Sequence, residues 1–358
     1  MMYVRTVAPF FLTLLLVAGC AGERPMLLER SEVEASGMMT ESSVLGDSAV
    51  NTDPVVIIDE GEGNEAPAVT TTTPSLPATA EGTLTTPRGG VRALISPTGV
   101  LVPVTGEADN GYLVTTPCGN GAFLGWGQPL LQTRVVIDPG HGGDEEGAVA
   151  DNGLTEAALN LRVARRAASE LAARGISVAL TRTADYRMPI TQRAAVADAL
   201  GAEAFVSIHH NTPAAAPSDK PGTEVYVQVD SAESRRLGGL IYEDVIAGLD
   251  RFDMAWVARS DAGVLAVVNG AGEDAYGINR HPTVPSALIE VAYLGNPLEA
   301  RLMESDQYVA TVGRSIADGI EQFLATADPG SGFVEQNRVF DPSGSTGGED
   351  GCVDPPLE

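Results

Sequence analysis

A short apolar run that ends in a glycine-rich turn constrains the fold of this chain more than any other feature. Residues 135–143 read Val-Val-Ile-Asp-Pro-Gly-His-Gly-Gly, which predicts a buried strand that stops at a turn carrying His141. The chain has four histidines, and His209 also follows an apolar run. Open α/β sheets bind ligands beyond the carboxyl ends of their strands. A metal site at these histidines is therefore the first hypothesis.

Strand and helix patterns alternate over residues 134–326, and we assign residues 134–327 to one domain. Thr155 is a candidate N-cap for the first helix, and Gly175 ends it. Strands are expected at residues 134–138, 176–181, 204–208, 224–229 and 287–291, and helices at 156–174, 191–200, 233–249 and 306–326. This alternation predicts an α/β fold with a mostly parallel twisted sheet flanked by helices on both faces.

Residues 89–133 have a different pattern, in which short β-like runs are separated by turn signals. Ser-Pro-Thr-Gly at residues 96–99 and Asp-Asn-Gly at residues 109–111 are such signals. They predict a small β element, either an SH3-like fragment or a pair of hairpins.

The charge is strongly unbalanced, with 48 acidic residues against 22 basic ones and a net charge of −26. Such a charge argues against nucleic acid and against anionic lipid surfaces as partners, and its plainest interpretation is solubility. Much of the acidity falls in residues 21–88 and 328–358, which are poor in aromatic residues. We expect a disordered Thr/Pro-rich tether in the first and a disordered acidic C-terminal tail in the second.

Residues 1–20 resemble a lipoprotein signal peptide. Arg5 precedes the apolar run 7–17, which is shorter than the roughly 20 residues that span a bilayer. The run ends in Leu-Val-Ala-Gly-Cys, similar to a bacterial lipobox with Cys20 as the lipidated residue. Lipidation would anchor an exported protein to the outer face of the cytoplasmic membrane. A plain secretory signal with a chance cysteine is the alternative.

Two further cysteines, Cys118 and Cys352, complete the set of three. In an exported protein an even pair favours a disulfide, which would join the acidic tail to the start of the core. Two unpaired thiols are the alternative.

Four polar residues stand where strands and the first helix are expected to meet. His141 and His209 follow strands, Glu156 opens the first helix, and Glu290 ends the strand at residues 287–290. Two histidines and one glutamate are a ligand set for catalytic zinc, and a further carboxylate can transfer protons. Singly, each histidine is more often structural and Glu156 is more often a favourable helix N-terminal charge. Glu290 is costly to bury without a partner or a role, so the four together favour a hydrolytic zinc site.

Four motifs in order carry a family resemblance. Ile-Asp-Pro-Gly-His-Gly-Gly, the early helical Glu, Ser-Ile-His-x-Asn and Leu-Ile-Glu-x-x-Tyr-Leu-Gly-Asn-Pro resemble the zinc-dependent N-acetylmuramoyl-L-alanine amidases of the amidase-3 type. The resemblance implies a peptidoglycan hydrolase that cleaves the amide between N-acetylmuramic acid and L-alanine of the stem peptide. It also implies that Zn²⁺ is held by His141, Glu156 and His209, with Glu290 as the catalytic residue. We further expect a monomer.

Other residues near these motifs have secondary assignments. Arg182 and Arg193 match arginines of the family, and we expect them to tie helices to strand ends. His210 competes with His209, but adjacent residues of a strand face opposite sides, and the motif favours His209. Tyr293 and Gly295 stand where the family commonly has Phe and Ser.

Two loops bear on how substrate would reach the site. Residues 262–285, with Glu273, Asp274 and His281, form a segment longer than is usual in the family, and we expect a substrate-side loop. Whether His281 contacts substrate or is only solvated stays open. Residues 212–222 are too few for the inhibitory helix that some family members insert there, so we predict none.

Two alternative functions stay open beside the amidase. One is another zinc wall peptidase, and the other is a non-catalytic wall-binding lipoprotein. Residues 89–133 could likewise serve in packing or in wall binding.

Overall fold

The computed structural model describes residues 90–212, 215–341 and 347–358. The predicted signal peptide with Cys20 and the predicted tether at residues 21–88 lie outside the described residues. Within the described ranges, no helix has both the length and the apolar character needed to cross a membrane.

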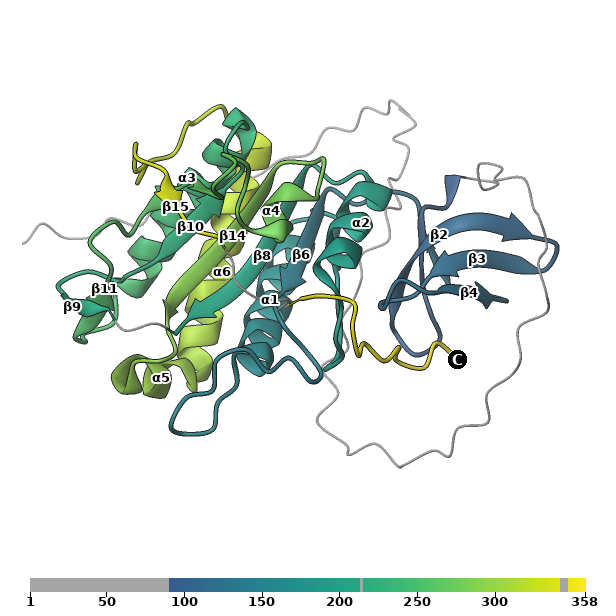
Figure 1. Cartoon of the computed structure of the whole chain (residues 1–358), viewed down its shortest axis with the longest axis horizontal. Coiled ribbons are helices and arrows are strands. Elements are labelled where there is room, and N and C mark those ends of the chain that lie inside the picture. Colours follow the sequence, from purple (N-terminus) through teal and green to yellow (C-terminus); the bar gives the residue numbers. More distant parts are fainter. Residues whose placement is uncertain (1–89, 213–214, 342–346) are drawn as a thin grey trace, which may run out of the picture. The chain divides into compact units, whose positions relative to one another are not determined.

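A six-stranded sheet forms the centre of the main domain, in the order β12-β10-β14-β8-β6-β7 (Figure 1). The strands are β6 (Val135–Pro139), β7 (Val178–Leu180), β8 (Ala204–Asn211), β10 (Glu224–Val227), β12 (Val264–Leu265) and β14 (Ser286–Tyr293). Neighbours pair in parallel except β10 with β14. The predicted α/β fold is confirmed, and the sheet is mixed because β10 and β12 run against the other strands. Parallel strands need a long crossover connection, usually a helix. Among the described residues no helix lies between β8 and β10, so β10 can run antiparallel to β8.

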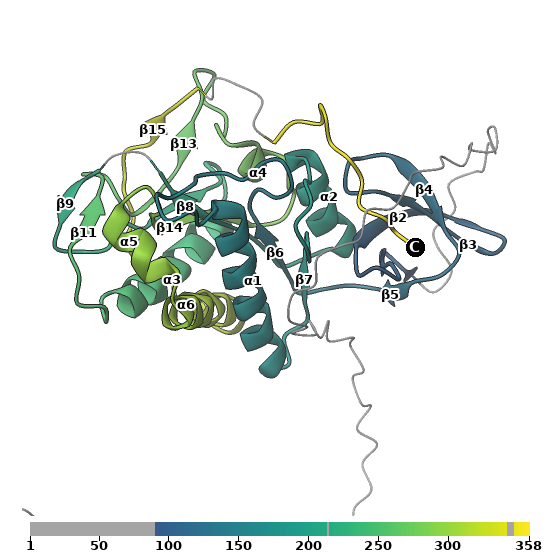
Figure 2. The same ribbon diagram turned by 90° about the horizontal axis from the view of Figure 1, so that it is seen from below.

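Helices cover both faces of this sheet, but unequally. One face packs against α1 (Glu156–Ala173), α3 (Ala232–Leu249) and α6 (Asp306–Ala325), and the other against α2 (Ile190–Leu200) and the short α4 (Gly277–Arg280). Figure 2 shows α1, α3 and α6 on the lower side of the sheet and α4 on the upper side. A further short helix, α5 (Pro297–Met303), follows β14. The α2/α4 face is therefore the more thinly covered of the two.

Side-chain caps begin the three long helices, and the cap predicted for the first of them is confirmed. The Thr155 side chain accepts a hydrogen bond from Ala158 N at 3.3 Å, so α1 starts at Glu156. Ser231 and Ser305 cap α3 and α6 in the same way. Glu156, a candidate ligand, is thus the first residue of α1.

The small β element is a five-stranded antiparallel sheet in the order β4-β3-β2-β1-β5. Its strands are β1 (Ala93–Ile95), β2 (Leu101–Ala108), β3 (Gly111–Thr115), β4 (Gly121–Leu124) and β5 (Gln128–Leu130). Ala93, Leu101 and Leu130 pack in one apolar cluster with Val196 and Leu200 of α2. The element therefore completes the α2 face of the main domain, in agreement with the packing role.

Within the ranges that the structure describes, two further two-stranded sheets lie outside the main sheet and the β element. β9 (Ala216–Ser218) pairs antiparallel with β11 (Trp256–Ala258), and β13 (Val267–Val268) pairs in parallel with β15 (Arg338–Val339). In residues 212–222, β9 is the regular element, and the described part contains no helix.

The expectation that residues 328–358 are disordered was wrong for the described part of the tail. β15 joins the main domain through β13, and Cys352 forms a disulfide with Cys118, with Cα atoms 5.7 Å apart. The predicted disulfide is thus confirmed. Low apolar content excludes a hydrophobic core within the tail itself. The tail is ordered because it pairs with a strand of the main domain and is joined to the β element by the disulfide.

Candidate functional site

The three predicted metal ligands lie together at the carboxyl ends of β6 and β8. His141 Nε2 is 3.3 Å from Glu156 Oε2, and His209 Nδ1 is 2.9 Å from Glu156 Oε1. One ligand atom from each residue lies within 4.8 Å of the other two. Two imidazoles and a carboxylate in one compact cluster are a donor set that suits zinc.

Glycines allow the two histidines to approach. His141 has φ 62°, and it is the only non-glycine residue with positive φ in the described ranges. A Cβ atom at Gly140 would lie 2.1 Å from His209 Nε2, and one at Gly142 would lie 2.3 Å from Tyr186 O. In the His141 turn (residues 138–143), a side chain at position 140 would therefore displace a candidate ligand, and one at position 142 would clash with the Tyr186 backbone.

Arg182 ties α1 to the end of β6. It is fully buried and donates hydrogen bonds to Pro139 O at 2.9 Å, Gly140 O at 3.0 Å and Ala157 O at 2.7 Å. Burial, and then repulsion from Arg193, lowers the pKa of Arg182 to about 10. The structural role predicted for this arginine is confirmed.

Arg193 has the matching role from α2. Its guanidinium donates to Asp138 Oδ1, Pro139 O and His141 O, each at 2.8 Å. Asp138 also accepts hydrogen bonds from Thr181 and Ser207. Burial acts to raise the pKa of Asp138, but Arg193 and these hydrogen bonds lower it overall. Sequence reasoning missed Asp138, although a carboxylate closing an apolar strand was a visible signal.

Glu156 is the centre of the cluster. Its Oε2 accepts a hydrogen bond from Ala148 N at 2.9 Å, and its Oε1 accepts one from His210 N at 3.2 Å. Burial acts to raise its pKa, but hydrogen bonds and charge from His141 and His209 lower it well below the usual range. The carboxylate is thus held ionised, as a cation ligand must be.

His210 points away from the cluster, toward α1 and α6. Its Nδ1 lies 2.7 Å from Asn160 Oδ1, and its Nε2 lies 3.0 Å from Tyr308 OH. Burial lowers the pKa of His210 to about 3, so the ring is neutral. The prediction that His209, and not His210, faces the cluster is confirmed.

Glu290 lies on β14 beside His209, its register partner on β8. Its Oε2 atom is buried and finds no hydrogen-bond partner among the described residues. Burial, and then repulsion from Glu156 and Glu224, raises the pKa of Glu290 well above its usual range. A half-buried carboxyl with one buried, unpaired oxygen calls for an explanation, and proton transfer supplies one.

Two cavities meet at this cluster and share His141, Glu145, His209 and Glu290. The first, here called the α4 cavity, is further lined by Ile190, Tyr276, Gly277, Ile278, Leu288 and Gly347. The second, here called the α1 cavity, is further lined by Gly147, Ala148, Glu156, Asn211 and Thr212. An extended substrate can therefore lie across the cluster with a part on each side.

The predicted substrate-side loop contributes to only one cavity. Residues 276–278, at the start of α4, line the α4 cavity. His281 ends α4 and is not among the lining residues of either cavity. Asp274 accepts a hydrogen bond from Val229 N, and Glu273 accepts one from Asn269, so both support the loop itself.

Glu145 is a second residue that sequence reasoning missed. It lines both cavities, pairs with Arg187 at 3.2 Å, and accepts a hydrogen bond from Gly347 N at 2.7 Å. The signal was the acidic run that directly follows the His141 turn, but its partner at Gly347 lies far along the chain.

The α/β fold and the compact cluster of two histidines and a glutamate beside Glu290 are typical of a hydrolase with a possible metal site. The comparison with protein families names the group: the amidase-3 family, N-acetylmuramoyl-L-alanine amidase, matches residues 135–322, and the chain belongs to this family.

Several known proteins are similar to this chain. The chain is 30% identical over 213 residues to the uncharacterized protein YqiI of Bacillus subtilis, with 59% of this chain and 92% of that protein covered. It is 30% identical over 226 residues to the germination-specific N-acetylmuramoyl-L-alanine amidase of Bacillus subtilis, with 59% and 88% covered. Among solved structures, the N-acetylmuramoyl-L-alanine amidase AmiC2 of Nostoc punctiforme matches at 30% identity and TM-score 0.45, with 53% and 96% covered.

Proposed function

We propose that this protein is a zinc-dependent peptidoglycan amidase that cleaves the amide between N-acetylmuramic acid and L-alanine of the stem peptide. The observation that carries the proposal is the meeting of His141, Glu156 and His209 with the unpartnered Glu290 between two cavities, in a chain of the amidase family.

The residues present fit a zinc ion. His141, Glu156 and His209 would hold it, because their donor atoms converge and Glu156 is ionised. Zinc bound there would supply Lewis acidity for the amide carbonyl and lower the pKa of a water molecule. The buried arginines behind the His141 turn keep the first histidine in place.

Glu290 would move the proton in this reaction. Its raised pKa makes the carboxylate a better proton acceptor than an exposed glutamate. It would take a proton from water as the oxygen attacks the lactyl carbonyl carbon. As the C–N bond breaks, the proton would pass from Glu290 to the leaving nitrogen, which becomes the free amine of L-alanine.

The direct test is product analysis with purified peptidoglycan. Stem peptides with a free N-terminal L-alanine should be released, and their release should stop with a chelator or with Glu290→Gln. Glu273→Gln, in the loop at residues 262–285 but outside the lining of both cavities, is a matched control that should keep activity. Release of single amino acids or of sugar fragments without free stem peptides would instead indicate another wall hydrolase.

We also propose that the protein is exported and lipidated at Cys20, acts as a monomer and does not bind nucleic acid. The sequence Leu-Val-Ala-Gly-Cys supports the lipidation, and the Cys118–Cys352 disulfide supports an oxidising compartment. Labelled fatty acid should be incorporated by the protein and by Cys352→Ser, but not by Cys20→Ser. Equal labelling of all three would contradict anchoring at Cys20.

A further inference from the structure

The C-terminal segment at residues 347–352 borders the proposed active site. Gly347 lines the α4 cavity together with His141 and Glu290. Its N–H donates to Glu145 Oε1 at 2.7 Å, and its carbonyl accepts a hydrogen bond from Ile190 N at 3.0 Å. The segment therefore closes part of the cavity wall between the N-terminus of α2 and the loop that follows His141.

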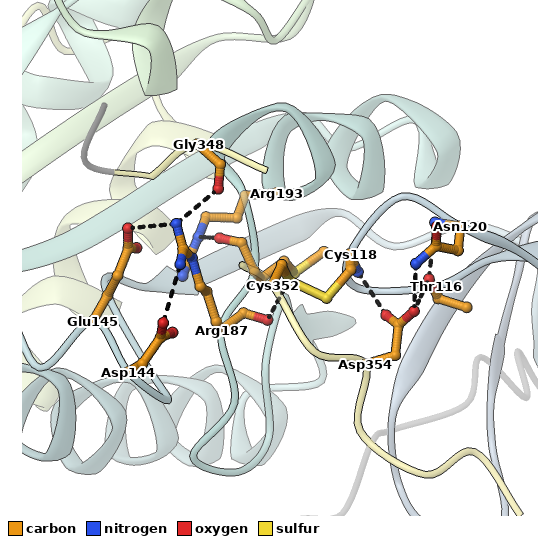
Figure 3. Close-up of a disulfide and its surroundings, with 11 residues drawn as sticks. Thr116, Cys118, Asn120, Asp144, Glu145, Arg187, Arg193, Gly348, Cys352 and Asp354 are labelled. Carbon is orange, nitrogen blue, oxygen red and sulfur yellow. Dashed lines mark hydrogen bonds and ion pairs between the residues drawn. A yellow bond between two sulfur atoms is a disulfide. The ribbon is translucent and has the colours of Figure 1, made fainter. Parts of the chain in front are cut away.

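One arginine ties the same segment to that loop. Arg187, which is mostly buried, donates to Gly348 O at 3.0 Å and pairs with Asp144 at 3.1 Å and Glu145 at 3.2 Å (Figure 3). Its guanidinium thus bridges the C-terminal segment and two acidic residues, of which Glu145 lines both cavities.

A covalent bond completes the attachment. Cys352 is joined to Cys118 of the β element across 234 positions (Figure 3). Just beyond it, Asp354 accepts hydrogen bonds from Thr116 Oγ1, Cys118 N and Asn120 Nδ2. Residues 347–352 form no helix or strand. Their position therefore depends on the disulfide and on a few polar contacts, since a long loop closed by weak contacts alone is entropically unfavourable.

We propose that the segment at residues 347–352, through Gly347, forms part of the substrate-binding wall of the amidase site and is held in place by the Cys118–Cys352 disulfide. The ligand is the part of the glycan–peptide substrate that lies in the α4 cavity, so the inference rests on the proposed function. With the disulfide open, the segment can leave Ile190 and Glu145, and the α4 cavity loses the part of its wall that Gly347 forms. The three candidate zinc ligands and Glu290 keep their own supports, so binding weakens more than chemistry does.

The test compares the double variant Cys118→Ser/Cys352→Ser with the parent on a soluble disaccharide-peptide. We expect KM to rise by about fivefold while kcat stays within about twofold, the signature of lost binding that is uniform between ground and transition states. Asp354→Asn is the matched control, because it loosens the chain beyond Cys352 and leaves the disulfide intact. Its KM should equal that of the parent. A similar rise in KM for Asp354→Asn would overturn the proposal.

A second variant displaces the wall without breaking the disulfide. Gly347 has φ 81°, and a Cβ atom there would lie 2.6 Å from Ile190 Cδ1. Gly347→Ala should therefore raise KM in the same direction. Affinity for the uncleaved substrate, measured calorimetrically in the Glu290→Gln background, should fall in parallel for both wall variants.

The outcomes separate the two proposals. If Tm falls but KM and affinity stay within about twofold for both wall variants, the disulfide is a purely structural staple and the wall proposal is wrong. If the parent releases no free stem peptides, the proposed function fails instead.

Discussion

The His141 turn and the 347–352 segment border the same cavity but are held by different means. The turn is fixed from inside, by the buried guanidinium groups of Arg182 and Arg193 on its carbonyl oxygens. The segment is fixed from outside, by a disulfide and by polar contacts of Arg187. Buried support from the core suits groups that must be placed accurately for chemistry. A surface segment held by a disulfide can differ in sequence, and so in the substrate it contacts, with little effect on the core.

The largest effects should come from the site that the turn carries. Glu290→Gln should lower kcat by about 10²–10⁴-fold, because the proton acceptor is lost, while zinc binding stays stoichiometric. His209→Ala should lose zinc as well as activity. Metal content by atomic absorption, measured beside turnover, separates the two. Unchanged turnover in Glu290→Gln would remove this residue from the mechanism.

The next largest effect tests the inner support of the turn. Arg193→Met leaves Asp138 buried without its cation, and breaking such a pair costs roughly 3–5 kcal/mol of unfolding free energy. The hydrogen bond to His141 O is lost too, so activity or zinc affinity should fall about 10–100-fold. Urea unfolding and zinc titration measure both.

Arg134→Met is the matched control for this variant. Arg134 pairs with Glu203 at the surface, and such pairs contribute at most about 1 kcal/mol. Equal losses in the two arginine variants would contradict the idea that the turn depends on a buried guanidinium.

A smaller effect concerns the layer behind the cluster and depends on pH. His210 has a folded-state pKa of about 3, below the unfolded value near 6.5, so the unfolded chain binds more protons between these limits. Its contribution to stability is complete above about pH 6.5 and is lost as the pH falls toward about 3. The difference in unfolding free energy between the parent and His210→Asn should shift by up to about 1.4 kcal/mol per pH unit in this window. Parallel urea-stability curves for the two proteins would reject a neutral buried ring.

The turn and the segment also differ in how far the sequence reveals them. The turn is readable because its information is local: glycines flank His141, a strand precedes it, and Thr155 marks the helix that brings Glu156. The disulfide could be predicted from cysteine parity, but the position of Gly347 beside Glu145 could not. That contact depends on how a tail without a periodic pattern packs on a finished domain.

Arg338 shows the same limit at the other end of the sheet. The strand that begins at Glu224 was predicted, but not that this carboxylate would be fully buried. Its partner is Arg338, whose guanidinium lies 2.9 Å from Glu224 and 2.8 Å from Asp261. We predicted disorder for the tail because it has few apolar residues. The contact of Arg338 with the sheet is instead an ion pair with two carboxylates, which apolar content does not reveal.

The smallest expected effect asks how redundantly Glu156 is held. Thr155→Ala removes the N-cap of α1 and should cost about 1 kcal/mol of unfolding free energy. Zinc affinity should change by less than about threefold, because Ala148 N and His210 N still donate to the Glu156 carboxylate. Calorimetric unfolding and zinc titration give the two numbers. A large loss of zinc affinity with so small a loss of stability would mean that the cap, and not these backbone donors, positions Glu156. The position of this candidate ligand would then depend on a single contact, as the position of residues 347–352 depends on the disulfide.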